Sequence, residues 1–289
     1  MMFPAAVVFL IFTYIPLFGW AMAFTDYRLG QGIFSGSFTG LKQFRLFFQN
    51  TNDFGYLIRD TLAINLTSIV LSPVLGLVFT VLLNELANKR YMKIVQSFSF
   101  FPYFVSWILV YAIMNGLFAT RMGSINLFLM DMGLIQRGIP LLADARYSWG
   151  LMIALNMWKG LGYISIIFFA TIKGISAELY EAAALDGASR FHRIRYITVP
   201  LCIPTASVLL ILSSGSVFSN NLEQFFVFWN STNWTTMEVL DIYIYNFGMR
   251  NMNFSYATAV GILKFAISLL LLLLVNRVFK QVNDTNIIG

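Results

Sequence analysis

The sequence contains few side chains that build disulfides, metal sites or charged surfaces. Its 289 residues include one cysteine, Cys202, and one histidine, His192. A single cysteine excludes a disulfide within the chain, and a single histidine leaves no ligand set for a histidine-based metal site. Charged residues make up 11% of the chain, whereas soluble proteins carry roughly 25%. Most of the chain is therefore expected to lie in lipid, with no bound metal.

The chain also lacks the motifs of nucleotide chemistry and catalysis. It has no Gly-x-x-x-x-Gly-Lys-Ser/Thr phosphate loop, and Ser35 stands where the stretch 30–36 would need a glycine to complete a dinucleotide fingerprint. His192 lies among arginines rather than in an apolar run, which argues against an intramembrane serine protease. We expect no catalytic residue and no cofactor on this chain. The net charge of +6 is interpreted as contact with the lipid membrane rather than with nucleic acid.

Six apolar runs are long enough to cross a bilayer, which takes ~20 helical residues. They extend from about 2 to 24, 62 to 83, 97 to 120, 148 to 172, 199 to 219 and 257 to 275. Backbone groups in lipid must bond internally, so each run is predicted to be a helix. The first run is longer than a signal-peptide core and has no basic segment before it, so we interpret it as a span. The predicted fold is all-α and integral to the membrane, with 1–289 as a single transmembrane domain.

The connections between the spans favour one orientation. With a cytoplasmic N-terminus, the inner connections carry nine basic and five acidic residues, whereas the longer outer connections carry eight of each. Basic residues concentrate in short cytoplasmic loops of membrane proteins. We therefore predict a multi-pass protein with both termini in the cytoplasm. The outer connections, at roughly 25–60, 120–147 and 220–256, are interpreted either as a docking face for a delivery protein or as a simple cover over the helix ends.

The connection 173–199 is predicted to form two short helices joined at a glycine. Ser176 is a good N-cap, and Glu178 lies in the first turn, where the helix dipole favours an anion. Gly187 ends this helix because it tolerates a positive φ, and Ser189 caps the next one. The second helix carries three arginines: Arg190, Arg193 and Arg195. These features alone leave open an ordinary amphipathic helix lying on anionic lipid.

The spacing within this segment resembles the EAA motif of binding-protein-dependent ABC importer permeases. The motif reads Glu-Ala-Ala, three residues, Gly, nine residues, Ile, one residue, an aliphatic residue and Pro, and here Val199 replaces the usual leucine. In that family the segment is the coupling helix, seated in a groove of the ATPase subunit. The resemblance implies a coupling role for these residues: Glu181, Ala182, Ala183, Asp186, Gly187, Ala188, Ile197 and Pro200.

Other segments extend the resemblance over nearly the whole chain. Stretches 14–19, 23–27 and 40–44 look like the first-span region of sugar-type permeases, and 96–107, 123–126 and 158–159 are similar to LplB-like permeases for oligosaccharides and polysaccharide fragments. The resemblance implies a type I ABC importer fold in a bacterial cytoplasmic (inner) membrane. It also implies four kinds of partner: a second homologous permease, two ATP-binding cassette subunits that hold ATP and Mg²⁺, an extracytoplasmic solute-binding protein, and the carbohydrate itself.

Polar residues inside the predicted spans are candidates for a substrate path. A lysine at the bilayer centre costs roughly 2.5–3.5 kcal/mol on insertion scales, so Lys159 should face protein or water. Its neighbour Trp158 offers an aromatic face for a sugar ring. The alternative for Lys159 is a packing contact with a carbonyl or a partner's carboxylate, and Lys264 is interpreted as structural. The full set of path candidates is Asn156, Trp158, Lys159, Tyr111, Asn115, Ser216 and Asn220.

A secondary carrier or channel for a small polar solute is the alternative function. Proton-coupled carriers use carboxylates within their spans, and the six predicted spans contain none at mid-depth. Secondary transporters often show internal repeats, and none is visible here. The sequence favours the importer permease but leaves open whether its saccharide is neutral or contains uronate.

Overall fold

The computed structural model describes residues 2–49 and 51–283, about three quarters of them helical. A two-stranded antiparallel hairpin, β1 (Thr25–Asp26) with β2 (Ser37–Phe38), follows the first span and pairs Thr25 with Phe38. The elements up to the middle of the chain are α1 (Met2–Phe9), the π-helix η1 (Leu10–Tyr14), the 3-10 helix η2 (Ile15–Phe24), α2 (Lys42–Gln49), α3 (Thr51–Asn84), α4 (Lys89–Phe100), the 3-10 helix η3 (Phe101–Phe104), α5 (Trp107–Phe118) and α6 (Ser124–Asp131). The remaining elements are α7 (Ala145–Lys173), α8 (Ala177–Leu185), α9 (Arg190–Arg193), the π-helix η4 (Ile194–Thr198), α10 (Val199–Ser214), α11 (Leu222–Phe228), α12 (Trp234–Met237), α13 (Leu240–Tyr245), the π-helix η5 (Asn246–Arg250) and α14 (Phe254–Asn283).

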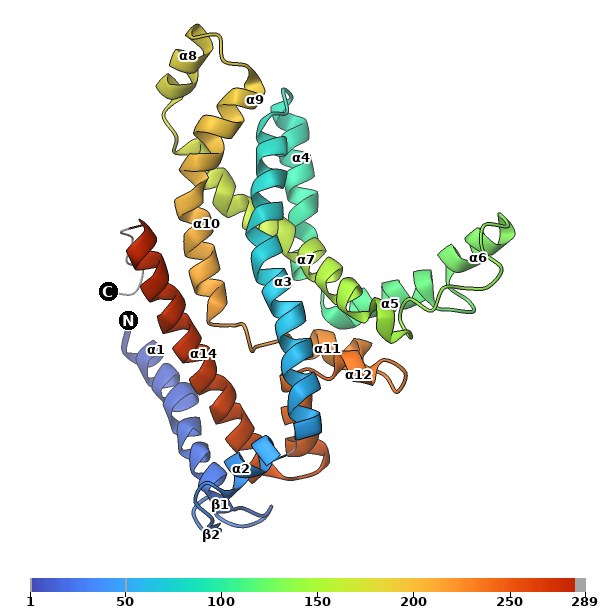
Figure 1. Cartoon of the computed structure of the whole chain (residues 1–289), viewed down its shortest axis with the longest axis vertical. Coiled ribbons are helices and arrows are strands. Elements are labelled where there is room, and N and C mark those ends of the chain that lie inside the picture. The colour runs from blue at the N-terminus through green and yellow to red at the C-terminus, as the bar shows by residue number, and fades with distance from the viewer. Residues whose placement is uncertain (1, 50, 284–289) are drawn as a thin grey trace.

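Five continuous helices in the described part of the chain are long and apolar enough to cross a membrane. They are Phe3–Phe24, Phe54–Asn84, Ala145–Lys173, Arg190–Ser214 and Phe254–Phe279. The hairpin β1–β2 lies at one end of the molecule and α8 at the other (Figure 1). These two ends are called the hairpin end and the α8 end below.

The third predicted span, 97–120, is not one straight helix. Lys89–Phe104 and Trp107–Phe118 meet at an angle of 104°. The break at Val105 and Ser106 is supported by other elements: Lys159 of α7 donates to the carbonyl of Val105, and Glu223 of α11 accepts from the backbone N–H of Trp107 at 3.2 Å. Non-helical backbone at membrane depth is tolerated where protein groups satisfy it. Only together do α4 with η3 and α5 reach the length and hydropathy of a span, and α5 turns away from α4 (Figure 1).

The fifth span begins earlier and ends earlier than the predicted 199–219. It runs from Arg190 to Ser214, so the second short helix predicted after the glycine is the first turns of this span. Pro200 has no N–H, and its ring clashes with the carbonyl four residues before it in a regular helix. The wider π-turn Ile194–Thr198 precedes this proline and lets the helix continue.

The bundle is built around α3 and α7, which cross with unusually close approach. A Cβ on Gly76 of α3 would collide with the Ile164 side chain of α7, and one on Gly162 of α7 would collide with the backbone at Ser99 of α4. Small residues permit such contacts between membrane helices. Three buried apolar clusters result, containing among others Ile64, Met152 and Phe225, then Leu57, Tyr243 and Val260, and finally Phe168, Ile172 and Cys202.

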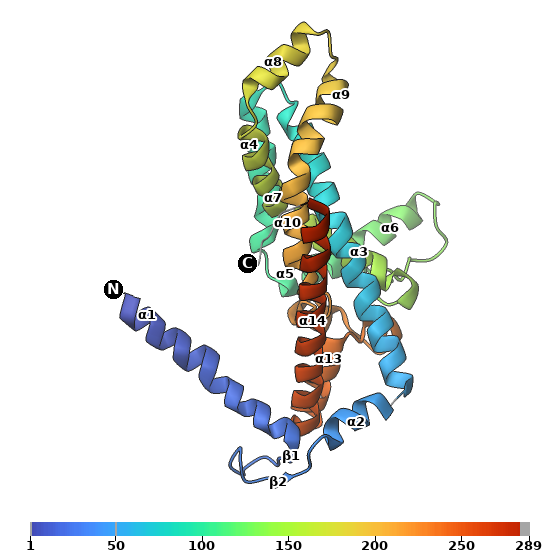
Figure 2. The ribbon, with the colours of Figure 1, turned by 60° about the vertical axis from the view of Figure 1, so that its left-hand side comes forward.

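The first span stands apart from the bundle. In its most apolar stretch of 18 residues, only 6% is buried within the chain. The corresponding share is 28% for each of the second, fourth and fifth spans. It contacts α14 near the hairpin, where the rings of Trp20 and Phe265 lie 5.5 Å apart. Figure 2 shows α1 diverging from α14 toward its N-terminal end. The exposed apolar faces of the first span are left for lipid or another protein to cover.

Candidate functional site

The segment with the EAA-like spacing forms the predicted helix, glycine turn and helix start. The hydroxyl of Ser176 accepts from the backbone N–H of Glu178 at 3.2 Å, and that of Ser189 accepts from His192 at 3.3 Å. Gly187 has φ +80°, and the backbone N–H of Ala188 donates to Ala183 at 2.9 Å. This pattern is a Schellman C-cap, which places glycine in the left-handed conformation. The predicted caps are confirmed.

Helix α8 protrudes beyond the ends of the spans (Figure 1). It contains no buried residue, and Leu185 is 90% exposed. One side-chain hydrogen bond, 2.9 Å between Tyr180 and Thr198, ties it to the start of the fifth span. A helix this exposed, with an apolar residue at its tip, has the character of a docking element.

The predicted coupling residues divide into two groups. Six of them share α8 and its glycine turn, namely Glu181, Ala182, Ala183, Asp186, Gly187 and Ala188. The other two lie in the fifth span: Ile197 is half-buried in the π-turn, and Pro200 opens α10. They therefore lie at the root of the protruding segment, while the first group lies on α8 and its glycine turn, which are mostly exposed.

A polar cavity of about 230 Å³ lies among α3, α7 and α10. The cavity lies beside the middle of α3 and of α7 and beside the hairpin-side end of α10. Its lining consists of amide, hydroxyl and apolar side chains: Asn65, Ser68, Ile69, Ser72, Asn156, Met157, Ser213, Ser216 and Ser219. Two of the predicted path residues, Asn156 and Ser216, therefore share one cavity.

Sequence reasoning missed the α3 wall of this cavity. Asn65, Ser68 and Ser72 are spaced i, i+3 and i+7, which places them on one face of a helix. Polar residues in that pattern within an apolar run were the available signal. Ser213 and Ser219, on either side of the predicted Ser216, complete the hydroxyl lining.

A chain of polar contacts closes the hairpin side of the cavity. The side-chain amides of Asn65 and Asn220 donate to each other at 3.1 and 3.3 Å, and Asn65 also donates to the carbonyl of Val217 at 2.7 Å. The backbone N–H of Asn220 donates to Asp241 at 2.6 Å, and Asp241 forms an ion pair with Lys264. This network links α3, the segment after α10, α13 and α14. It gives Lys264 a structural partner and places Asn220 at the edge of the cavity.

The other path candidates point elsewhere. Trp158 lines a separate apolar cavity of about 340 Å³ between α4 and α7. Lys159 donates to the carbonyl of Val105 and lies 4.6 Å from the Trp107 ring; this is the carbonyl contact that the sequence left as an alternative. Tyr111 packs edge-on against Phe228 with the ring centroids 5.1 Å apart, and Asn115 is exposed on α5. The structure does not bring these four residues to the polar cavity.

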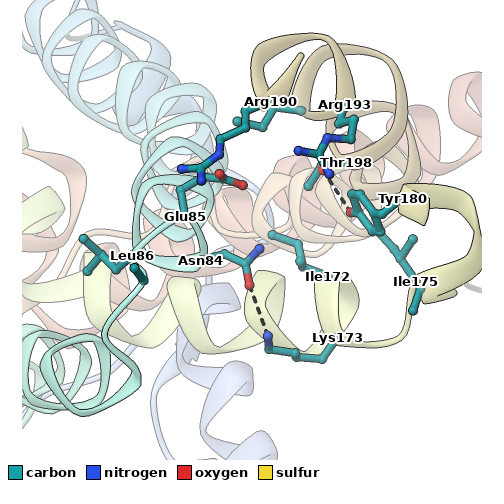
Figure 3. A pocket seen from close by; sticks show the side chains of 13 residues that line it. Asn84, Glu85, Leu86, Ile172, Lys173, Ile175, Tyr180, Arg190, Arg193 and Thr198 are labelled. Carbon is teal, nitrogen blue, oxygen red and sulfur yellow. Dashed lines mark hydrogen bonds between the residues drawn. The ribbon is translucent and has the colours of Figure 1, made fainter. Parts of the chain in front are cut away.

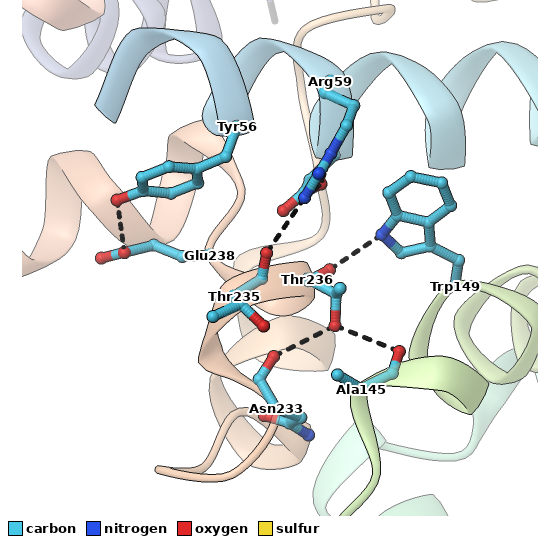
Figure 4. Close-up of polar contacts among 9 residues, drawn as sticks. Tyr56, Arg59, Ala145, Trp149, Asn233, Thr235, Thr236 and Glu238 are labelled. Carbon is cyan, nitrogen blue, oxygen red and sulfur yellow. Dashed lines mark hydrogen bonds and ion pairs between the residues drawn. The ribbon is translucent and has the colours of Figure 1, made fainter. Parts of the chain in front are cut away.

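The segment 220–256 is folded, and it packs over α3 and α7 (Figure 4). The indole of Trp149 donates to the carbonyl of Thr236 at 3.1 Å, and Arg59 donates to the carbonyl of Thr235 at 3.2 Å. Tyr56 donates to Glu238 at 2.9 Å. Because these bonds join three separate elements, this long connection is held firmly against the hairpin-side ends of α3 and α7.

The start of α7 is fixed by a charged cap. Asp144 accepts from the backbone N–H of Arg146 at 2.9 Å and from its guanidinium at 2.6 Å. These hydrogen bonds lower the pKa of Asp144 below its ordinary value.

The described residues contain no group of three or more His, Cys, Asp or Glu side chains placed to hold a metal ion.

Comparison with known proteins identifies the family. A family model described as the binding-protein-dependent transport system inner membrane component matches residues 72–284. The chain belongs to this family. Its all-α membrane fold is that of an ABC importer permease, and its α8 lies within the matched region.

Relatives support the same assignment over almost the full chain. Protein LplB of Bacillus subtilis (strain 168) is 34% identical, covering 97% of this chain and 87% of LplB. The polygalacturonan/rhamnogalacturonan transport system permease protein YteP of the same organism is 33% identical, covering 99% and 88%. A chain in the crystal structure of a bacterial alginate ABC transporter, solved in complex with an alginate pentasaccharide-bound periplasmic protein, is 29% identical with a TM-score of 0.88 and covers 99% of this permease and 95% of that chain.

Proposed function

We propose that this permease is the membrane subunit of an ATP-binding cassette importer for an oligosaccharide or polysaccharide fragment. The observation that carries the proposal is α8, an exposed helix at one end of the spans with a left-handed Gly187 cap. Its place in the permease family makes α8 the element that receives motion from an ATPase. The saccharide class rests on the relatives, whose names include a polygalacturonan/rhamnogalacturonan system and an alginate transporter.

The proposed assembly has a second homologous permease, two ATP-binding cassette subunits that hold ATP and Mg²⁺, and an extracytoplasmic solute-binding protein. The first span supports a permease partner because most of its apolar surface is uncovered by its own chain. The α8 end is proposed to face the cytoplasm together with both termini. In support, basic residues gather at the span ends beside α8: Lys89, Arg90, Lys93, Lys173, Arg190, Arg193 and Arg195.

The polar cavity is the proposed part of the substrate path. Amides and hydroxyls donate to and accept from sugar hydroxyls, and the lining has no charged side chain. Alternating access would expose this cavity first toward the hairpin end and then toward α8. A uronate group would need its cationic partner outside the cavity, because the lining itself offers only amide, hydroxyl and apolar side chains.

Copurification from the native membrane tests the class of transporter. After mild solubilisation, the tagged permease is expected to bring down a second permease and an ATPase, and the complex should import labelled oligosaccharide into liposomes only with ATP and a binding protein. Recovery of the permease alone, with uptake that follows a proton gradient, would instead establish the secondary carrier.

Asn156→Leu tests the path itself. This change replaces a cavity-lining amide with an apolar side chain of similar size, so uptake should require about tenfold more sugar for half-maximal rate, matching the ~1–1.5 kcal/mol of one hydrogen bond. Asn115→Leu is the matched control, because Asn115 is exposed on α5 and outside the cavity. Equal effects of the two changes, measured as concentration dependence of uptake in liposomes, would remove the cavity from the path.

A further inference from the structure

A second and larger cavity lies between α8 and the ends of the spans. It has a volume of about 580 Å³. Side chains from five elements line it: Lys173 from α7, Tyr180 from α8, Arg190 and Arg193 from α9, Thr198 from η4 and Asn84 from the end of α3 (Figure 3). The cavity is separate from the polar cavity, since no residue lines both.

The lining of this α8-side cavity is strongly basic. It includes three cations, Lys173, Arg190 and Arg193, and one acid, Glu85. Lys173 donates to the side chain of Asn84 at 3.2 Å. Within the described chain, the guanidinium groups of Arg190 and Arg193 form no hydrogen bond or ion pair, and Nε of Arg193 is buried without a partner. A buried donor without a partner is costly, so Arg193 lacks a hydrogen-bond acceptor at this site.

The position of the cavity indicates where such an acceptor comes from. Three spans end at its rim: the second at Asn84, the fourth at Lys173 and the fifth at Arg190. The cavity therefore lies at the level of the membrane surface, where phospholipid headgroups are the concentrated anions. Arginine is suited to them because its planar fork binds a phosphate with two parallel hydrogen bonds.

We propose that the α8-side cavity binds the phosphodiester group of an anionic phospholipid, with Arg190 and Arg193 as its ligands. Lys173 adds charge on the opposite wall, and the acyl chains leave between the span ends. The same cavity adjoins Tyr180 and Thr198, whose hydrogen bond holds α8 to the fifth span. A bound headgroup would thereby brace α8 from behind. The binding itself requires only that the chain is embedded in a membrane, and it stands whether or not the proposed sugar transport does.

Lipid retention by the full-length permease, purified in detergent with whatever partners it brings down, tests this proposal; this preparation is called the complex below. The double variant Arg190→Gln and Arg193→Gln is compared with Arg195→Gln, which removes an exposed arginine of the same segment that does not line the cavity. After delipidation in detergent, the complex is titrated with phosphatidylglycerol and analysed by native mass spectrometry. We expect the double variant to bind phosphatidylglycerol at least tenfold more weakly at one site, while the Arg195 variant binds like the unaltered complex. An equal loss in both, or no loss in the double variant, would refute the site.

Two further arms separate the source of the phosphate and the risk of misfolding. Phosphatidylcholine, whose headgroup is neutral overall, should bind weakly, and inorganic phosphate at millimolar concentration should not displace phosphatidylglycerol. Displacement by inorganic phosphate would identify a free-anion site and overturn the lipid assignment.

The double variant Arg190→Lys and Arg193→Lys should keep part of the binding, because the positive charge remains while the two-pronged geometry of the guanidinium is lost. Binding equal to that of the glutamine variant would contradict arginine-directed recognition, provided that both complexes elute intact from size exclusion.

Discussion

Gly187→Val should abolish most uptake while leaving the permease inserted in the membrane. Gly187 has φ +80°, a conformation that costs an L-residue roughly 1–2 kcal/mol and suits a β-branched residue least. A Cβ at this position meets no atom within 4 Å, so the substitution strains the backbone without creating a clash. The turn would relax by moving α8 relative to the fifth span. Uptake and sugar-stimulated ATP hydrolysis should both fall by about tenfold or more, the factor that ~1.4 kcal/mol represents.

The control for this result is Gly133→Val. Gly133 also has positive φ, +70°, and also has open space where a Cβ would lie. It follows α6 and is distant in the sequence from the coupling element, so it carries the same backbone strain in a different place. Uptake in liposomes should stay near normal for this variant. Normal uptake by Gly187→Val, or an equal loss in both variants with unchanged membrane yield, would contradict the role assigned to α8.

Lys264→Met should destabilise the permease more than other single changes on α14. Lys264 and Asp241 form an ion pair whose side chains are only 16% and 18% exposed. Removing one partner of a buried pair costs about 3–5 kcal/mol of folding free energy because a charge is left uncompensated. Both side chains here keep some contact with water, so the expected loss lies near the lower end of that range. Asp241 also accepts from Asn220 at the edge of the polar cavity. The variant should therefore lose both thermal stability in detergent and affinity for sugar.

A double variant checks that the uncompensated charge causes the loss of stability. Combining Lys264→Met with Asp241→Asn removes both charges, and the amide oxygen still accepts from Asn220, so much of the stability should return. Lys264→Arg should retain the ion pair and stay near the unaltered permease. Melting temperatures followed by fluorescence-detected size exclusion give the three comparisons. A double variant as unstable as Lys264→Met would show that Lys264 acts through packing alone.

Local features of the fold were predictable because each depends on a few neighbouring residues. The cap at Ser176, the left-handed Gly187 and the second cap at Ser189 all follow from side-chain chemistry within one or two turns. The apolar runs identified most of the spans for a similar reason. Hydropathy is summed along the chain and needs no knowledge of what each helix contacts.

The break in the third span shows what local reasoning could not supply. Pro102 and Ser106 are visible in the sequence, but an apolar helix tolerates a proline when neighbours satisfy the freed backbone groups. Here the neighbours are Lys159 and Glu223, which lie 54 and 116 residues away from their backbone partners. The same long-range contacts explain Lys159, which the sequence proposed for the substrate path and the structure uses to hold the bend.

The polar cavity depended in the same way on helices that are distant in the sequence. Asn156 and Ser216 were candidates along with Trp158, and only the rotation of α7 against α3 and α10 separates the residues that face the cavity from those that do not. By itself, the sequence determined that the chain is a membrane protein with a capped helix–glycine–helix element, because composition and short-range capping decide both; the permease type came from the resemblance of that element's spacing to a known motif. The tertiary structure decided which polar residues meet, because helix rotation, the bend before α5 and the Lys264–Asp241 ion pair arise from contacts between spans.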